Sequence, residues 1–238
     1  MPPPSLCGKG KTMSKNFAVA IDGPSGAGKS TIARTCAQTL GFLYVDTGAI
    51  CRTVGLAALR RGLDSHDKGA VLAILPELNI ELSHAADGLQ HMMLDGEDVT
   101  AEIRRPEVSL AASAVSAYPE VRAFLMELQR SLARTHTVIM DGRDIGTVVL
   151  PDAPLKIFLT ASAEARAKRR WKELKEKGRE QPFEEVLREM ELRDKNDSER
   201  AAAPLKAAED AVLLDTTALD FQQSCEAVMK LIRERWTP

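Results

Sequence analysis

The chain has 238 residues, 44% of them hydrophobic and 28% charged, which is typical of a globular protein that can bury a full core. Its 32 Lys and Arg residues against 34 Asp and Glu give a formal net charge of −2. This balance argues against a nucleic acid as partner unless the arginines gather on one face. Because no apolar run approaches the roughly 18 residues that a membrane span needs, we expect no membrane association.

The N-terminal segment, residues 1–15, is expected to be a disordered tail before a folded domain of residues 16–238. It lacks the apolar stretch of a signal peptide, and Met13 is an alternative start. The four cysteines form no C-x-x-C pair and lie mostly in apolar segments, which favours small buried thiols in a reducing, cytoplasmic compartment. They are Cys7, Cys36, Cys51 and Cys225.

From residue 17 onward, short apolar segments alternate with amphipathic ones. The apolar segments predict strands, and the segments between them predict helices. Such alternation favours a parallel sheet with helices on both faces, whose active site lies beyond the carboxyl ends of the strands. The expected strands cover residues 17–21, 42–45, 137–140, 155–159 and 211–214.

The first expected strand runs directly into a glycine-rich loop with the sequence GPSGAGKST. This is the G-x-x-x-x-G-K-[ST] pattern between a strand and a helix, where backbone N–H groups can converge on phosphate oxygens. Lys29 is expected to reach the β and γ phosphates of ATP, and the Ser30 hydroxyl to ligate Mg²⁺. The residues of this phosphate loop are Gly23, Pro24, Ser25, Gly26, Ala27, Gly28, Lys29, Ser30 and Thr31.

After the second strand the alternation breaks, and we interpret residues 63–134 as an insert. A short helix precedes two segments that predict a β-hairpin with Asp87–Gly88 as its turn. Two helices follow, each opened by a proline in its first turn. The expected hairpin strands are 79–84 and 90–95, and the expected helices are 106–117 and 119–134. An insert of this kind is suited to hold a second substrate opposite the phosphate loop.

Two polar motifs follow strand ends and offer arginines to an acceptor. Thr47 and Arg52 lie where the second strand gives way to a helix, a place that can hold an anion. Asp141 ends the third strand, where P-loop enzymes place a carboxylate near Mg²⁺, and Arg143 and Asp144 then emerge into the cleft. Alternatively, Arg52 could be a solvated helix residue, and Arg143 with Asp144 a surface ion pair. Because the sequence has no N-K-x-D motif, a GTP-dependent switch is disfavoured.

A third group of arginines lies in the helical segment of residues 163–203, which we interpret as a lid. Most of them alternate with glutamates and are expected to form a charged helix face, so that only a few reach the site. These arginines are Arg166, Arg169, Arg170, Arg179, Arg188, Arg193 and Arg200.

Taken together, the motifs resemble those of bacterial cytidylate kinases, type 1 members of the nucleoside monophosphate kinase family. They are IDGPSGAGKST, DTGAICR, GEDVTAEIR, ASAVSAYPEVR, DGRDIGTVVLPDAPLKIFL and RDKNDSERAAAPL, in this order. The resemblance implies an α/β P-loop NTPase fold: a five-stranded parallel sheet between helices, an acceptor-binding insert with a small antiparallel sheet, and a short helical lid. The implied division is core 16–62, insert 63–134, core 135–162, lid 163–203 and core 204–238.

The resemblance also assigns residues to the two substrates. It places the acceptor phosphate on Thr47, Arg52, Arg143 and Arg200, the cytosine on Ser113, Arg122 and Asp144, and the pentose on Arg193 and Asp197. For ATP it adds Arg169 to the phosphate loop. Charge neutralisation in catalysis would come from Lys29, Arg143, Arg193 and Arg200, with Mg²⁺ near Ser30 and Asp141. The family usually has tyrosine where Cys51 stands, so we expect weaker ordering of the acceptor helix without loss of activity.

The choice of base has a physical reason of its own. The exocyclic amine of cytosine donates to a carboxylate such as Asp144, whereas the corresponding carbonyl of uracil would face it acceptor to acceptor. The expected reaction is transfer of the γ-phosphoryl group of ATP to CMP or dCMP, without a general base because the acceptor phosphate is already anionic. A kinase of UMP, AMP or shikimate, and a nucleotide-binding switch without turnover, stay open as alternatives. We expect a monomer with no nucleic-acid partner.

Overall fold

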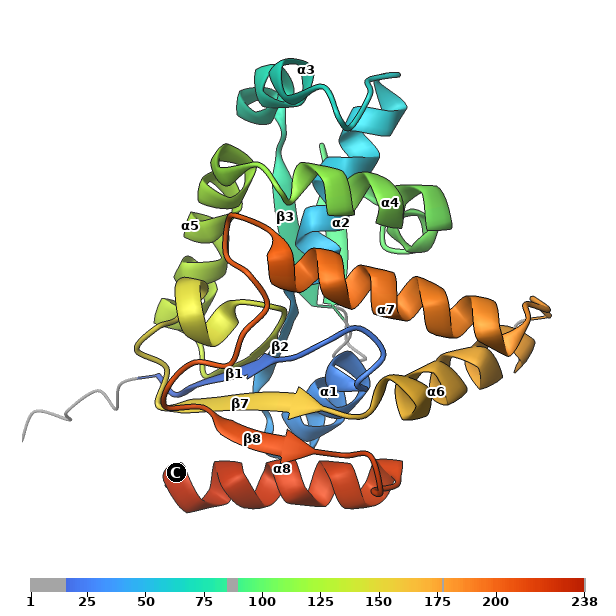
Figure 1. Cartoon of the computed structure of the whole chain (residues 1–238). Coiled ribbons are helices and arrows are strands. Elements are labelled where there is room, and N and C mark those ends of the chain that lie inside the picture. The colour runs from blue at the N-terminus through green and yellow to red at the C-terminus, as the bar shows by residue number, and fades with distance from the viewer. Residues whose placement is uncertain (1–15, 85–89, 177, 238) are drawn as a thin grey trace, which may run out of the picture.

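The computed structural model describes residues 16–84, 90–176 and 178–237. The expectations for the N-terminal tail, for Cys7 and for the hairpin turn fall outside these residues. The fold has a central sheet with helices on both faces, further elements above the sheet, and a pair of helices alongside it (Figure 1).

Five parallel strands form the central sheet, in the order β2-β6-β1-β7-β8. They are β1 (Ala18–Asp22), β2 (Leu43–Asp46), β6 (Val138–Asp141), β7 (Leu155–Thr160) and β8 (Val212–Asp215). The five strand predictions are confirmed, with ends that differ by one residue at most. Because β1 lies between β6 and β7, the end of β1 is next to the end of β6, and the phosphate loop begins there.

The inner strands of this sheet are buried on both faces, whereas the edge strand β8 is partly exposed. Alternate residues of the inner strands enter two different cores. In β1, Ala18 and Ala20 pack on one face. Val19 and Ile21 pack on the other, as the period of two in a strand requires. The helices of the second face are α1 (Lys29–Leu40) and α8 (Phe221–Arg235). On the first face lie α2 (Thr47–Arg60) and α5 (Pro119–Thr135).

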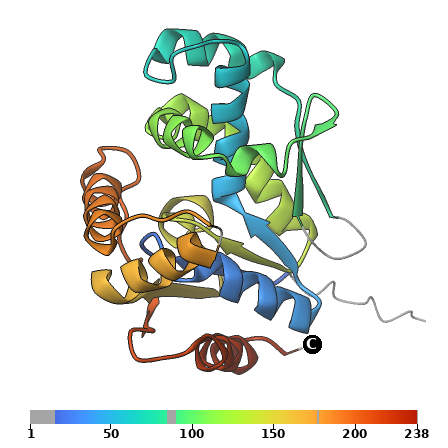
Figure 2. The same cartoon turned by 90° about the vertical axis from the view of Figure 1, so that its right-hand side faces the viewer.

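The elements between α2 and β6 form the group that we call the insert, which stands above the sheet in Figure 2. They are α3 (Lys68–Ile74), a 3₁₀ turn (Leu75–Glu77), β3 (Ile80–His84), β4 (Gln90–Leu94), β5 (Glu97–Asp98), a second 3₁₀ turn (Glu102–Arg104), α4 (Pro106–Val115) and α5. The expected hairpin is confirmed as β3 and β4, which pair antiparallel. The two-residue strand β5 completes a three-stranded sheet and is too short to give a sequence pattern.

Helices α2 and α4 of this region pack unusually closely at Gly55. A side-chain carbon at Gly55 would lie 2.8 Å from the backbone nitrogen of Ala112. A larger residue would therefore push α4 away from α2, so this glycine allows the close distance between α4 of the insert and α2.

Beyond β7, the expected lid consists of two helices, α6 (Ala163–Glu176) and α7 (Phe183–Glu199), which we call the arm. A small core of their own holds them together, made of Ala167, Leu174, Val186 and Met190. They lie at the carboxyl ends of β1 and β7 (Figure 1). The arm also contacts the phosphate loop, since a side-chain carbon at Gly26 would lie 2.8 Å from the methyl carbon of Met190.

Two observations bear on the expected environment of the chain. Within the described residues, Cys36, Cys51 and Cys225 are free thiols. None of the helices in this part of the chain has the length and apolar character needed to cross a membrane.

Candidate active site

A cleft with a volume of about 680 Å³ opens at the carboxyl ends of the central strands. The phosphate loop, the insert and the arm all contribute to its walls, and it brings together nearly all the residues named from the sequence. Those that line it are Ser25, Gly26, Ala27, Gly28, Lys29, Ser30, Thr31, Thr47, Arg52, Ser113, Arg122, Asp141, Arg143, Asp144, Arg169, Arg193, Asp197 and Arg200. Gly23 and Pro24 belong to the phosphate loop but not to the lining.

The phosphate loop needs its glycines for steric reasons. Gly23, Gly26 and Gly28 have φ angles of 146°, 72° and 88°, which are unfavourable for residues with a side chain. At Gly23, a side-chain carbon would lie only 1.9 Å from the carbonyl oxygen of Leu159. The loop then leads into the N-terminus of α1, whose first N–H groups have no partner within the helix and favour an anion.

Lys29 is the first residue of α1 and is only 5% exposed. Its Nζ donates to the carbonyl oxygen of Pro24 at 2.7 Å. Burial and the nearby charge of Arg143 hold the pKa of Lys29 well below its usual range, while Asp141 and Asp22 act in the opposite direction. A phosphate in the loop would therefore stabilise the ammonium form, and the lysine is placed to exchange the carbonyl for a phosphate oxygen.

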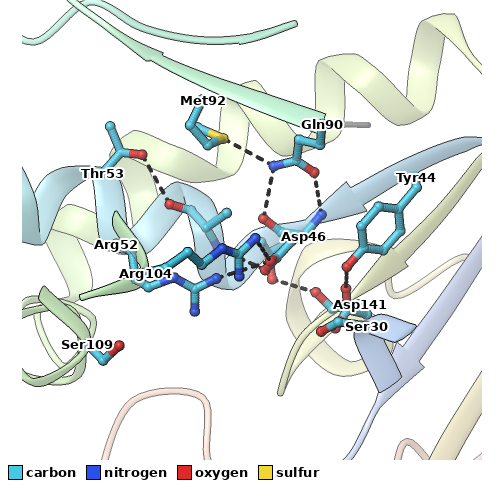
Figure 3. Close-up of polar contacts among 12 residues, drawn as sticks. Ser30, Tyr44, Asp46, Arg52, Thr53, Gln90, Met92, Arg104, Ser109 and Asp141 are labelled. Carbon is cyan, nitrogen blue, oxygen red and sulfur yellow. Dashed lines mark hydrogen bonds and ion pairs between the residues drawn. The ribbon is translucent and has the colours of Figure 1, made fainter. Parts of the chain in front are cut away.

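Asp141, at the end of β6, is the polar centre of the phosphate-loop side. Ser30 Oγ donates to one of its carboxylate oxygens at 2.8 Å, and the Tyr44 hydroxyl donates to the other at 2.7 Å (Figure 3). Burial and the charge of Asp46 raise the pKa of Asp141 to about 6, against the opposing effect of Lys29. A cation at this place would favour the ionised carboxylate.

The oxygen atoms of Ser30 and Asp141 suit a hard cation such as Mg²⁺. Among the residues that the structure describes, no three His, Cys, Asp or Glu side chains form a metal-binding group. A divalent cation here would therefore need phosphate oxygens and water as further ligands, which is the usual mode for Mg²⁺ in nucleotide sites. The donor set fits a cation that arrives together with a nucleotide.

The raised pKa of Asp141 predicts a pH-dependent stability. The pKa of about 6 in the folded chain exceeds the ordinary value of 3.8, so the folded state binds this proton more tightly than the unfolded state. The stabilising contribution of the protonated Asp141 side chain is present below pH 3.8 and is lost as the pH rises through about 6. The uncharged variant Asp141→Asn should therefore be more stable than the wild type at pH 7, by up to about 3 kcal/mol.

The measurement is urea unfolding without nucleotide between about pH 4 and 7, with the difference between the two proteins expected to shrink towards zero at the acid end. Asp98→Asn is the matched control, because hydrogen bonds from Thr100 and His91 lower the pKa of Asp98 to about 2. Because the ionisation of Asp98 differs between the folded and unfolded states mainly below pH 3.8, the difference in stability between this variant and the wild type should change much less over this range. A difference at Asp141 that does not change with pH would contradict the prediction.

At the end of β2, Asp46 forms ion pairs with two arginines. Its carboxylate accepts from Arg52 and from Arg104, each at 3.0 Å (Figure 3). Burial alone would raise the pKa of Asp46, but the charges of the two arginines and a hydrogen bond from the Ala49 N–H lower it. Gln90 of β4 accepts from the backbone N–H of Asp46 at 2.6 Å, so the small sheet of the insert braces this cluster.

Arg104 lines the cleft, and the sequence interpretation gave it no role. It ends the motif GEDVTAEIR, so the motif contained the signal. Arg104 does not follow a strand of the central sheet, however, so the polar residues at the strand ends do not include it. Arg52 has a side chain only 18% exposed, which contradicts the alternative of a solvated helix residue.

Arg143 and Asp144 each pair with a distant residue. Arg143 Nε donates to the Asp197 carboxylate of α7 at 2.8 Å, which ties the end of β6 to the arm. Asp144 is 6% exposed and accepts from Arg122 of α5, and Arg200 Nη2 lies 3.6 Å from its other oxygen. The alternative of a surface ion pair between Arg143 and Asp144 is therefore wrong.

The arginines of the cleft crowd one another, although the whole chain is slightly acidic. Burial and the nearby Arg143 lower the pKa of Arg193. Burial and the nearby Arg122 lower the pKa of Arg200. In the part of the chain that the structure describes, the Nε of Arg52 and the Nη2 of Arg200 are buried without a hydrogen-bond partner. Unpaired buried donors and crowded cations are both unfavourable, so this half of the cleft favours an anion.

The remaining arm arginines range from buried to exposed, and the exposed Arg170 also lines the cleft. Arg166 is buried and donates to the carbonyls of Ala161 and Ser25 at 2.8 and 3.0 Å, so it supports the phosphate loop from beneath. Arg169 donates to the Thr216 carbonyl at 2.6 Å on the same side of the cleft. Arg179 and Arg188 are exposed and do not line the cleft.

This fold and this cleft define a class of protein: a P-loop phosphotransferase whose cleft has the phosphate loop on one side and an arginine-rich wall on the other. Residues 19–234 match the family model described as cytidylate kinase. A cytidylate kinase of Caldicellulosiruptor bescii is 50% identical over 217 residues, which cover 91% of this chain and 96% of that protein. A cytidylate kinase of Desulfitobacterium hafniense is 50% identical over 223 residues, 94% of this chain and 95% of that protein. The chain belongs to the cytidylate kinase family.

Among solved structures, an uncharacterised protein from Eubacterium ventriosum superposes with a TM-score of 0.52 at 13% sequence identity. The match covers 92% of this chain and all of that one. At this level of identity the likeness concerns the fold alone.

Proposed function

We propose that this protein transfers the γ-phosphoryl group of ATP to CMP and to dCMP, giving ADP with CDP or dCDP. The observation that carries the proposal is the pair of buried donors that make no hydrogen bond, Arg52 Nε and Arg200 Nη2, in the cleft that also holds Lys29. They supply a second anion site opposite the phosphate loop, as a kinase with a phosphorylated acceptor requires. Membership of the cytidylate kinase family supports CMP as that acceptor.

For the donor, we assign the triphosphate of ATP to residues 23–31 and its remaining part to the side of the cleft near Arg169. Lys29 would contact the β and γ phosphates in place of the Pro24 carbonyl. Ser30 would hold Mg²⁺ directly and Asp141 through water. When bound, Mg²⁺ would neutralise phosphate charge and fix the orientation of the phosphates.

For the acceptor phosphate, we assign Thr47, Arg52, Arg143 and Arg200. A carboxylate lies beside each of the three arginines: Asp46, Asp197 and Asp144, respectively. Since a guanidinium has five N–H donors in a planar fork, an arginine held on one edge can still present its other edge to a phosphate. Thr47 opens α2, where free backbone N–H groups add to the anion site.

For the acceptor base and sugar, we assign Ser113, Arg122 and Asp144 to cytosine, and Arg193 and Asp197 to the pentose. Asp144 is buried, so the carbonyl of a base such as uracil would face a buried carboxylate oxygen with no proton between the two acceptors. Cytosine has the required amine and uracil lacks it. This difference is the physical basis for selectivity for CMP over UMP.

Catalysis in this proposal is positioning and charge neutralisation. Lys29, Arg143, Arg193 and Arg200 all line the same cleft and would compensate the charge of the transferring group. The phosphate of CMP already carries the nucleophilic oxygen, so no side chain has to remove a proton before transfer. The arm, which contacts the phosphate loop through Met190, would exclude water and limit hydrolysis of ATP.

The finer expectations stay predictions. They are the division into core 16–62, insert 63–134, core 135–162, lid 163–203 and core 204–238, a monomeric state, a cytoplasmic location and the absence of a nucleic-acid partner. The separate core of the arm supports the lid as a unit of its own, whereas the insert shares its core with one face of the sheet.

The test is an acceptor panel: ATP and Mg²⁺ with CMP, dCMP, UMP, AMP or shikimate, each product identified by chromatography. We expect CMP and dCMP to be used with a kcat/KM at least about tenfold above that of UMP, and AMP and shikimate to give no product. Preferred use of another acceptor would replace CMP in the proposal. ATP hydrolysis unaffected by any acceptor would favour a nucleotide-binding switch instead.

A further inference from the structure

Asp22 ends β1 immediately before the phosphate loop, where its charge acts on the pKa of Lys29, and it does not line the cleft. Its side chain is 4% exposed. One carboxylate oxygen accepts from the backbone N–H of Ile145 at 2.7 Å, and the other accepts from that of Gly146, also at 2.7 Å. These two N–H groups open a π-helical turn, Ile145–Val149, so one buried carboxylate caps this turn from a segment more than a hundred residues earlier.

The residues held in this way adjoin the acceptor site directly. Before the turn, the N–H of Gly142 donates to the carbonyl of Ile21 at 3.0 Å. The end of β1 therefore holds both ends of the short segment that carries Arg143 and Asp144. The carbonyl of Asp144 accepts from Val148 N–H at 2.9 Å, so a movement of the turn would also move Asp144.

Gly146 leaves little room for a side chain between the turn and the neighbouring strands. A side-chain carbon there would lie 3.1 Å from Cδ of Lys156 and 3.4 Å from Asp22 Oδ2. Burying a carboxylate is unfavourable unless its oxygens are satisfied. Two backbone donors satisfy the oxygens of Asp22, so the carboxylate serves to hold these two N–H groups rather than to add to the core.

We propose that Asp22 is a positioning residue for acceptor selection: through Ile145 and Gly146 it fixes Arg143 and Asp144 relative to the phosphate loop. This inference rests on the proposed function, because it assigns the acceptor phosphate to Arg143 and the acceptor base to Asp144. The inference goes beyond that function because Asp22 belongs to β1, the strand that leads into the phosphate loop, and yet contributes to recognition of the acceptor. Asp22 itself touches neither substrate.

The test uses Asp22→Asn, which keeps the size of the side chain but turns one acceptor into a donor that faces a backbone N–H. We expect the KM for CMP to rise at least about tenfold, because a buried donor loses its charged acceptor. The preference for CMP over UMP should narrow, while the equilibrium Kd for ATP, measured without acceptor, changes less than about twofold. Hydrogen exchange should accelerate in residues 141–150 and stay unchanged in residues 23–31.

Two further variants make the test decisive. Gly146→Val brings a side chain against Lys156 and Asp22 but changes neither Asp22 itself nor the sequence of the phosphate loop, so it should displace the turn and give the same selective loss of CMP affinity. It decides the question if Asp22→Asn does not fold. Asp67→Asn is the matched control, because Asp67 also accepts from a backbone N–H, that of Ala70 at 3.0 Å, but in the insert and outside the cleft. It should leave the KM for CMP and the exchange of residues 141–150 unchanged.

An unchanged KM for CMP in both Asp22→Asn and Gly146→Val would overturn the inference. Equal losses of ATP and CMP affinity would also overturn it, because they would show a role in the phosphate loop or in the fold as a whole. The acceptor preference of the wild type, measured in the same experiment, tests the proposed function independently of this inference. If the wild type prefers a different acceptor, the function is wrong, and the selective effect on that acceptor and the exchange of residues 141–150 still test the role of Asp22.

Discussion

Replacing Lys29 by methionine is expected to lower turnover of CMP by at least about a thousandfold while leaving the fold intact. The substitution removes the ammonium group and keeps an apolar side chain of similar length. In the wild type this group lies buried beside the phosphate loop, next to the Pro24 carbonyl. In a cleft that excludes water, a fixed positive charge near a developing negative charge contributes far more than in water. Turnover is measured as ADP released in the presence of saturating CMP.

The melting temperature distinguishes a variant that has lost catalysis from one that has lost its fold. Burial lowers the pKa of Lys29, so the charged form is unfavourable in the free protein, and the melting temperature of Lys29→Met should equal or exceed that of the wild type. Lys156→Met is the matched control. Lys156 is also buried, pairs with Asp210 at 2.8 Å and lies outside the cleft lining, so its loss should leave turnover nearly unchanged. Near-normal turnover of Lys29→Met would refute the assignment of the phosphate loop.

Asp144→Ala is expected to produce the second largest loss, at least about a hundredfold in kcat/KM for CMP. The substitution removes the acceptor for the cytosine amine and also leaves Arg122 without its buried partner. UMP should lose less, because its carbonyl gains nothing from the carboxylate in the wild type. The preference for CMP over UMP therefore narrows, and parallel kcat/KM measurements with the two nucleotides detect the change.

The control for Asp144 is Asp98→Ala, which removes an exposed carboxylate of the insert whose partner is His91. It should alter neither the preference nor the turnover. Asp144→Asn adds a finer test, since a carboxamide can accept from cytosine and can also donate to uracil. It should retain more CMP activity than Asp144→Ala and raise the relative use of UMP. If Asp144→Ala and Asp144→Asn both keep the wild-type preference for CMP over UMP, Asp144 does not recognise the base.

The central strands could be predicted because each contains a short apolar run, even the partly exposed edge strand β8. Their order could not, because no local feature of Val138–Asp141 indicates that this strand lies between β1 and β2. The predicted helix 106–117 ends at Val115, and β5 was not predicted. Helix ends and very short strands depend on neighbours far along the chain rather than on local propensity.

For the candidate site, the phosphate loop was the most predictable part. Its geometry is local: glycines with positive φ, a lysine at the start of a helix, and a strand before them. The acceptor half was less predictable because its contacts are not local. Arg104 reaches Asp46 across 58 positions, and Arg143 pairs with Asp197 rather than with its neighbour. No pattern within one motif contains such pairings.

The sequence by itself determined the P-loop class, the strands of the sheet and the residue types available for two anion sites, because these depend on spacing and on the conformations that glycine allows. Only the tertiary structure decided which charges neutralise one another. Asp46 holds Arg52 and Arg104, Asp144 holds Arg122, and Asp22 holds the turn beside Asp144. The reason is physical: burial makes an unpaired charge so unfavourable that each carboxylate takes the partner that the packing of distant elements brings to it.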